Sequence, residues 1–235
     1  MAFGFRPRFW PTVMTVPALL VLLALGTWQV QRLGWKEDLI GKLHSRATAE
    51  AVQLPAGPLD IEDWEFRRVT VTGTFDHAHE LFWVQRSKSG DAGFHVVTPM
   101  TRADGQGTLL IARGWVPFEE REQRFRMDNL PQGDQTITGL LRFARGGSSL
   151  LPDNDINRNS WFWLDPVAAA RQIGVDSLPD YFVMAETQGA GPLPAAKQWT
   201  LDIRNDHLQY AITWFGLAAA LLAVYIMFHL KQGKD

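Results

Sequence analysis

Cysteine is absent from this chain of 235 residues. No thiol nucleophile and no thiolate metal site can therefore form, and the lack of thiols that would mispair fits an oxidising compartment. The sequence also contains no Gly-x-Ser-x-Gly elbow, no phosphate-binding loop and no dinucleotide fingerprint. Nothing in the sequence indicates a catalytic centre, and we expect the protein not to be an enzyme.

An excess of positive charge is also absent. The chain has 23 Lys and Arg against 25 Asp and Glu, which gives a formal net charge of −2. Proteins that bind nucleic acids usually present a basic face. The composition therefore argues against a nucleic-acid partner.

Two long segments contain no Asp, Glu, Lys or Arg, namely residues Phe9–Val30 and Tyr210–Leu230. A helix needs about 20 apolar residues to cross the hydrocarbon core of a bilayer. Both segments reach that length. The sequence therefore predicts two transmembrane helices and a lipid bilayer as a partner of the chain.

Two spans place both ends of the chain on one side of the membrane. Short basic flanks tend to stay in the cytoplasm, and the basic residues here are Arg6, Arg8, Lys231 and Lys234. We therefore predict cytoplasmic tails at residues 1–8 and 231–235, and one periplasmic domain at residues 31–209. The expected location is a bacterial inner membrane.

A cleaved signal peptide is the alternative interpretation of the first apolar segment. Residues Ala24-Leu25-Gly26 resemble a processing site of the small-x-small type after a basic start. The apolar character continues past this point through Trp28 and Val30. We therefore favour a retained span.

The middle of the chain alternates between apolar and polar residues, which is typical of half-buried strands. The predicted strands are 66–75, 80–86, 94–100 (ending at Pro99), 108–116, 135–143, 161–164 and 181–185. Helices are expected at residues 31–46, continuing the first span, and at 165–172, where Asp165 is the N-cap and Pro166 the first helical residue. The predicted fold class is an α+β membrane protein with a β-rich, mainly antiparallel sheet or small barrel between two transmembrane helices.

Two histidines, His77 and His79, lie two residues apart between predicted strands. This spacing can bind a transition metal when a third ligand converges on it. A polar turn explains the same residues, and we favour that interpretation.

A third histidine, His207, lies where the second span begins. On a helix that starts near Asn205, four residues share one face, namely His207, Tyr210, Ala211 and Trp214. An imidazole can ligate haem iron, a small residue leaves room for a flat ring, and Arg204 can pair with a propionate. An interfacial anchor at headgroup level explains the same pattern, and spacing alone favours the anchor.

Four blocks of sequence, taken in order, resemble the Surfeit locus 1 family of cytochrome c oxidase assembly factors. They are Leu25–Lys36 (LGTWQVQRLGWK), Gly93–Pro99 (GFHVVTP), Leu110–Pro117 (LIARGWVP) and His207–Phe215 (HLQYAITWF). The blocks extend over nearly the whole chain and keep the layout of two spans. The resemblance therefore covers the full predicted architecture.

The resemblance implies an inner-membrane protein that binds haem a transiently and helps to insert it into subunit I of cytochrome c oxidase. It implies His207 as the axial ligand of the haem iron, and a haem a synthesis or delivery protein as a further partner. Arg113, Gly114 and Trp115 match the family block RGWVP, which we interpret as strand-end packing and as a candidate partner surface.

Two other functions stay open at this stage. One is a scaffold without a cofactor that stabilises an intermediate in the assembly of subunit I. The other is a periplasmic hydrolase, for which the sequence offers no set of nucleophile and base.

Overall fold

The computed structural model describes residues 7–87, 89–147, 151–197 and 204–231. The chain divides into two compact units, one formed by Met1–Lys42 with Asp202–Asp235 and the other by Leu43–Leu201. We describe each unit by itself and call them the helical unit and the β unit. The basic flanking residues Arg6 and Lys234 lie outside the described residues.

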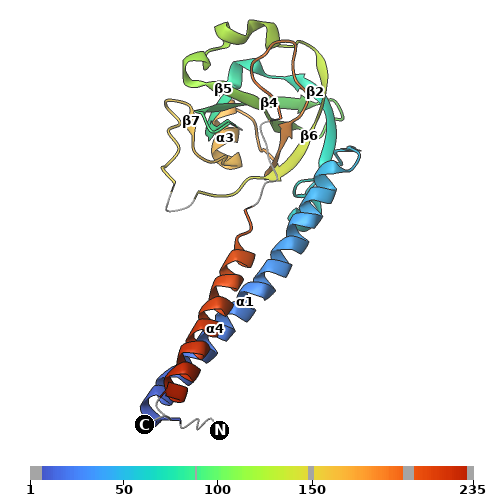
Figure 1. Ribbon diagram of the computed structural model, residues 1–235. Helices are drawn as coiled ribbons and strands as arrows, with labels where there is room; N and C mark the ends of the chain where they lie inside the picture. The colour runs from blue at the N-terminus through green and yellow to red at the C-terminus, as the bar shows by residue number, and fades with distance from the viewer. Residues whose placement is uncertain (1–6, 88, 148–150, 198–203, 232–235) are drawn as a thin grey trace. The chain divides into compact units, whose positions relative to one another are not determined.

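The helical unit contains two long apolar helices, α1 (Phe9–Thr48) and α4 (His207–Lys231) (Figure 1). Both are long and apolar enough to cross a membrane, as predicted. Helix α1 continues without a break past Val30, and its last turns, beyond Lys42, belong to the β unit. The membrane boundaries predicted at residues 30 and 210 stay predictions.

Helices α1 and α4 contact each other at several levels and run antiparallel. A Cβ atom on Gly26 would lie 2.7 Å from the ring of Phe215, so only glycine allows this approach of the two helices. Further along, the hydroxyl groups of Thr12 and Tyr225 lie 2.7 Å apart. The pairing therefore combines close packing with hydrogen bonds between the helices.

The β unit is built on one eight-stranded sheet with the order β1-β2-β6-β8-β5-β4-β3-β7. An additional antiparallel pairing of β2 with β4 closes five of these strands, β2, β6, β8, β5 and β4, into a ring. The strands are β1 (Val52–Gln53), β2 (Arg68–Phe75), β3 (Leu81–Arg86), β4 (Ala92–Arg102), β5 (Thr108–Pro117), β6 (Asp134–Phe143), β7 (Ser160–Trp161) and β8 (Tyr181–Ala185). Five of the eight pairings are antiparallel. This confirms the prediction of a β-rich, mainly antiparallel domain.

Short helical segments connect the strands. They are α2 (Ile61–Trp64), α3 (Pro166–Ile173) and the 3₁₀ segments η1 (His77–His79), η2 (Phe118–Glu120) and η3 (Gln123–Asn129).

Alternating side chains of the ring strands form two apolar layers. In β5, Leu109 and Ile111 belong to the cluster that all five ring strands share, while Leu110 belongs to a second cluster. The second cluster also contains Ala169 and Ile173 of α3. The ring is thus filled by side chains, and α3 covers part of its outer side.

We predicted that the strand containing Pro99 would stop there. Strand β4 instead continues to Arg102, so this prediction is wrong. Proline lacks the N–H group that a ladder needs, so it is expected at edges and bulges. In β4 it falls between two partners, because the pairing with β3 ends at Val97 and the pairing with β2 begins at Met100. The missing donor therefore lies where β4 changes neighbours.

Three other predicted strands are shorter in the structure, and the one predicted at 80–86 begins one residue later, at Leu81. The first begins at Arg68 rather than at residue 66, because Phe66 has a φ angle of 62°, outside the extended region. The strand predicted at 161–164 is limited to Ser160–Trp161.

Helix α3 begins where predicted, with Asp165 as its N-cap and Pro166 as its first residue, and ends at Ile173, one residue later than predicted. The side chain of Asp165 accepts hydrogen bonds from the backbone N–H groups of Val167 at 2.9 Å and Ala168 at 3.1 Å. At the other end, Gly174 adopts the left-handed conformation with φ 83°.

Replacing this N-cap tests the contribution of α3 to the β unit. We expect Asp165→Ala to lower the free energy of unfolding by about 1 kcal/mol, because two N–H groups lose their acceptor. Urea unfolding of the full chain in detergent measures the change. Asp165→Asn keeps an acceptor oxygen and should stay near wild type; an equal loss in both variants would contradict the role of the cap.

Candidate functional site

The predicted haem-site residues lie at the start of α4, whose first residue is His207. At about 100° per residue, their order around the helix is Tyr210, Trp214, His207 and then Ala211. Tyr210 at one edge is 53% exposed, Trp214 and His207 between the edges are half-buried, and Ala211 at the other edge is 3% exposed. The four residues therefore form one face, but its Ala211 edge is covered and only its Tyr210 edge is open.

The ring of His207 is held by a residue that sequence reasoning missed. Its Nδ1 atom lies 2.7 Å from Oε1 of Gln29 on α1. A carbonyl oxygen only accepts, so Nδ1 donates in this contact, and in the neutral form of the ring Nε2 carries the lone pair. Within the described part of the chain, no group bonds to Nε2. The one signal for Gln29 in the sequence is an amide side chain inside a charge-free apolar segment.

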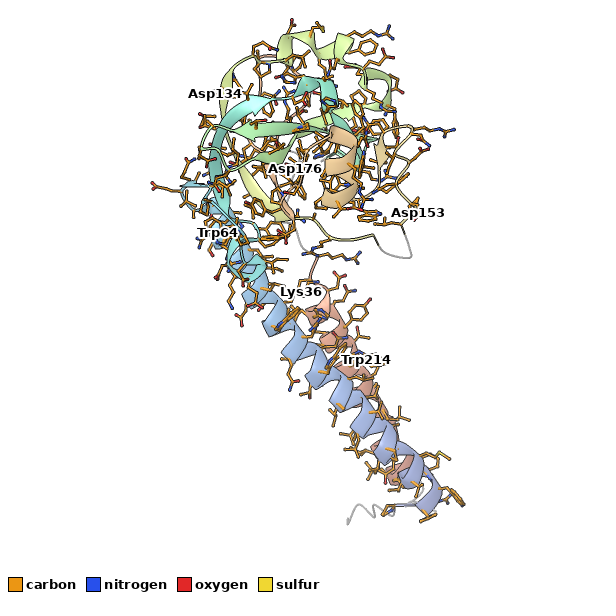
Figure 2. All side chains as sticks on the ribbon, turned by 180° about the vertical axis from the view of Figure 1, so that it is seen from behind. Lys36, Trp64, Asp134, Asp153, Asp176 and Trp214 are labelled. Carbon is orange, nitrogen blue, oxygen red and sulfur yellow. The ribbon has the colours of Figure 1, made fainter. Side chains whose placement is uncertain are left out.

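Arg204 lies just before α4 with its side chain 85% exposed. Its guanidinium pairs with the carboxylate of Asp206, and its backbone carbonyl accepts a hydrogen bond from Nζ of Lys36 on α1. Figure 2 shows Lys36 and Trp214 on the two helices of this unit. Arg204 is therefore an exposed side chain that forms an ion pair with one neighbouring carboxylate.

The histidines His77 and His79 do not converge on a common point. Nε2 of His77 lies 3.0 Å from the carbonyl oxygen of Pro131, while Nδ1 of His79 lies 2.6 Å from Oδ2 of Asp76. Among the described residues, no group of three His, Asp or Glu side chains is placed to hold a metal ion. The polar-turn interpretation, in which the segment forms η1, fits this arrangement.

Residues Arg113, Gly114 and Trp115 lie on β5, opposite the GFHVVTP block on β4. His95 pairs with Trp115, and Val96 pairs with Gly114. Burial lowers the pKa of His95 to about 4, so this histidine is uncharged at neutral pH.

Gly114 and Trp115 are both engaged by the segment that follows β8. Gly114 has a φ angle of 150°, and a Cβ atom there would lie 2.4 Å from the carbonyl oxygen of Ala195. The backbone of Trp115 exchanges two hydrogen bonds with Ala195, at 2.8 and 2.9 Å. The block therefore packs at the end of a strand, and its role as a partner surface stays a prediction.

Arg113 is buried and takes part in a cluster around Glu80, which we call the Glu80 cluster. Arg126 bonds both carboxylate oxygens of Glu80, at 3.0 and 2.6 Å, and Nη1 of Arg113 lies 3.5 Å from Oε1. Gln123 and Thr98 donate to the same carboxylate at 3.1 and 3.3 Å. One buried carboxylate thus serves two buried guanidinium groups.

Charges in the Glu80 cluster shift the pKa values of its members. Burial alone would raise the pKa of Glu80, but hydrogen bonds from His77 and Arg126, and the charge of Arg126, lower it to about 2. Burial lowers the pKa of Arg113 to about 10, despite the opposing effect of Glu80. Glu80 and Arg113 are therefore both charged at neutral pH.

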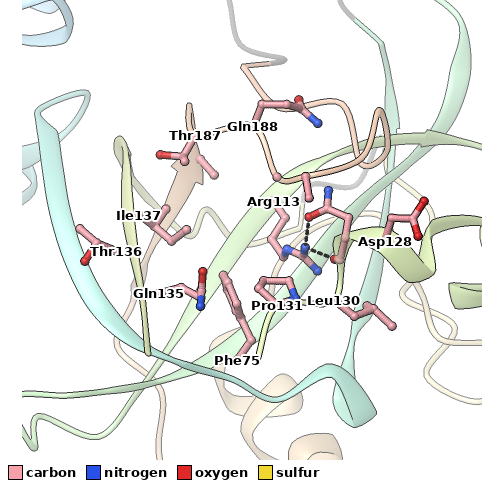
Figure 3. A pocket seen from close by; sticks show the side chains of 14 residues that line it. Phe75, Arg113, Asp128, Leu130, Pro131, Gln135, Thr136, Ile137, Thr187 and Gln188 are labelled. Atoms are coloured by element: carbon pink, nitrogen blue, oxygen red, sulfur yellow. Dashed lines mark hydrogen bonds between the residues drawn. The ribbon is translucent and has the colours of Figure 1, made fainter. Parts of the chain in front are cut away.

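Arg113 also lines a cavity of about 440 Å³ in the β unit (Figure 3). Its Nη2 atom donates to the backbone carbonyl and, at 2.9 Å, to Oδ1 of Asn129, on the cavity wall. Both Nη atoms are thus committed to protein groups. This arrangement supports a structural role for Arg113.

The Glu80 cluster predicts a pH-dependent stability. Because the folded-state pKa of Glu80 lies below its ordinary value of 4.5, the ionised carboxylate stabilises the fold above about pH 4.5. That stabilisation is lost as the pH falls toward 2. We expect Glu80→Gln to lower the free energy of unfolding at pH 7 by about 3–5 kcal/mol, since two buried arginines lose their counter-charge.

Urea unfolding followed by tryptophan fluorescence at several pH values measures this effect. The difference between Glu80→Gln and wild type should shrink between pH 4.5 and 2. Glu122→Gln is the control, because Glu122 is 65% exposed and pairs with exposed Arg124. A loss that is the same at pH 2 and pH 7 would contradict the assignment.

The fold and the site define a class of protein. Its members combine a small β-barrel domain with two apolar helices, and a histidine of one helix is hydrogen-bonded to the other. The profile of the SURF1 family matches residues 16–219. The chain is 37% identical to human Surfeit locus protein 1, over 83% of this chain and 70% of the human protein. It is 35% identical to the mouse protein, over 88% of this chain and 71% of the mouse protein.

The chain also matches a bacterial relative over nearly the whole length of that relative. The SURF1-like protein of Rickettsia felis is 31% identical, over 88% of this chain and 92% of that protein. The chain belongs to the SURF1 family. Membership of this family of assembly factors implies a role in the assembly of cytochrome c oxidase.

Proposed function

We propose that this protein holds haem a at the membrane surface through Nε2 of His207 and aids its insertion into subunit I of cytochrome c oxidase. The observation that carries the proposal is the state of the imidazole, with Nδ1 bonded to Gln29 and Nε2 facing no protein donor among the described residues. A neutral imidazole with one committed nitrogen is the usual form of a histidine that ligates a metal.

The residues around His207 suit an amphipathic, anionic porphyrin. The open edge at Tyr210 and Trp214 offers aromatic surface to a flat ring, and the exposed guanidinium of Arg204 can pair with a propionate. Asp206 competes for that guanidinium. Because Ala211 is covered and Tyr210 is exposed, we expect such a ring to lie beside Tyr210 rather than above Ala211.

Besides a ligand for the iron, a haem a carrier needs an apolar environment for the prenyl tail, and the two apolar helices lie in one. The prenyl tail of haem a is poorly soluble in water, and hydrocarbon at the start of α4 can hold it while the iron is ligated. A single protein ligand favours release, which transfer to subunit I requires. When bound, the haem would supply an iron centre that an imidazole nitrogen can ligate.

We further propose that both chain ends lie in the cytoplasm and that the β unit lies in the periplasm of a bacterial inner membrane. The support is the pair of apolar helices and the basic residues that flank them, Arg6, Arg8, Lys231 and Lys234. This orientation puts His207 at the periplasmic surface.

Absorbance of the purified protein tests haem binding. We expect wild type in detergent to show a Soret band with one haem a per chain, and His207→Ala to lose most of it. His44→Ala, which removes an exposed histidine of α1, should keep the band. Wild type that binds no haem a, or His207→Ala that retains all of it, would contradict the proposal and favour the scaffold without a cofactor.

The absence of cysteine makes a single introduced cysteine a specific probe of the orientation. We expect a membrane-impermeant maleimide to label Asp153→Cys, at an exposed position of the β unit, in cells whose outer membrane alone is permeabilised. Lys234→Cys should react only after the inner membrane is opened. The reverse pattern would contradict the proposed topology.

A further inference from the structure

Gln29 occupies an unusual position for an amide side chain. It lies in the apolar part of α1, between Trp28 and Val30, which are 52% and 49% exposed, whereas Gln29 is 9% exposed. An amide placed in hydrocarbon without a hydrogen-bond partner costs several kcal/mol. The side chain of Gln29 is buried on α1, so its amide needs a hydrogen-bond partner on α4. That partner is His207.

The contact between Gln29 and His207 selects one tautomer of the ring. Because Oε1 accepts at 2.7 Å, Nδ1 must donate, and in the neutral ring the single proton is then on Nδ1 and not on Nε2. His229, the other histidine of α4, also donates through Nδ1 but has a protein partner at its second ring nitrogen. Its Nδ1 donates to the carbonyl oxygen of Tyr225 at 2.7 Å, and its Nε2 accepts from the backbone N–H of Arg8 at 3.1 Å.

This difference separates the two histidines chemically. Both nitrogens of His229 are used within the protein, and its ring is 2% exposed. His207 is half-buried, and its second nitrogen is not engaged by any described residue. Only His207 is therefore equipped to accept a ligand from outside the helix pair.

We propose that Gln29 is a positioning residue for haem a: it fixes the tautomer and the orientation of His207 so that Nε2 faces the iron. This inference rests on the proposed function. An acceptor behind a ligating histidine increases the basicity of the ligand, and loss of such a partner typically weakens metal binding by about 10- to 100-fold.

The helix pair holds Gln29 in place for this role. One turn before it, Gly26 allows the ring of Phe215 to approach closely, and two turns after it, Nζ of Lys36 donates to the carbonyl oxygen of Arg204. Contacts on both sides of the Gln29–His207 pair thus fix the separation of α1 and α4 at this level.

The competing explanation is a hydrogen bond that only joins two helices. Such bonds contribute about 0.6–2 kcal/mol to the association of membrane helices. A purely structural bond would affect the stability of the helix pair but would leave the affinity, spectrum and reduction potential of bound haem unchanged. The two roles therefore give different results in the same variants.

Titration of the purified full chain in detergent with haem a distinguishes them. We expect Gln29→Leu to weaken binding by about 10- to 100-fold. Gln31→Leu is the matched control, since Gln31 is an exposed amide two residues away on the same helix, and it should bind as wild type does. Gln29→Glu keeps an acceptor for Nδ1 and should restore binding, with a lower reduction potential because the ligand becomes more basic.

Nitrogen-15 NMR of the haem-free protein, labelled at histidine, provides a readout that does not depend on haem. The signal of His207 is identified by its loss in His207→Ala. Wild type should show the tautomer with the proton on Nδ1, and Gln29→Leu should lose that preference. Circular dichroism confirms that each variant keeps its helices.

The outcomes separate this inference from the proposed function. If wild type binds haem a and Gln29→Leu binds it equally tightly with an unchanged spectrum, the role of Gln29 is wrong while haem binding by His207 stands. If wild type binds no haem a, the proposed carrier function is wrong, and the proposed role of Gln29 is then wrong as well. Weaker binding in Gln31→Leu as well would show a general effect on α1 and would also overturn the inference.

Discussion

Polar groups inside an apolar helix pair have to find their partners within the pair, and this constraint organises the helical unit. Gln29 bonds His207, Thr12 bonds Tyr225, and the backbone of Arg8 bonds His229. The first two bonds join side chains of α1 and α4, and the third joins the residue just before α1 to α4, so these contacts fix the register of the two helices. His207 meets this requirement through Nδ1, whereas its Nε2 has no partner among the described residues.

The four sequence blocks that mark the family form two pairs in the structure. LGTWQVQRLGWK on α1 lies against HLQYAITWF on α4 through the contacts of Gly26 with Phe215 and of Gln29 with His207. GFHVVTP on β4 pairs with LIARGWVP on β5 along an antiparallel ladder. The order of the blocks was readable from the sequence, whereas their pairing depends on contacts between residues that are far apart in the chain.

Local patterns predicted most of the elements and few of their relations. Alternation located most strands, and the residues Asp165 and Pro166 located the start of α3, because these signals act within a few residues. The extension of β4 past Pro99 depends on a change of strand partner, which no local pattern records. For the same reason Gln29 and the burial of Arg113 were not predicted, since both depend on a partner elsewhere in the chain.

The ring of strands also constrains the order in which the domain can be completed. Strand β8 is the last of the ring strands in the sequence, yet it lies between β6 and β5 and bonds both of them. Until residues 181–185 arrive, β5 and β6 expose unpaired backbone groups of the kind that recruit other strands. A chain that stops before residue 181 therefore lacks the strand that joins β5 to β6, and its ring of strands stays open. Such a truncation exposes two strand edges, and its effect is larger than the number of missing residues suggests.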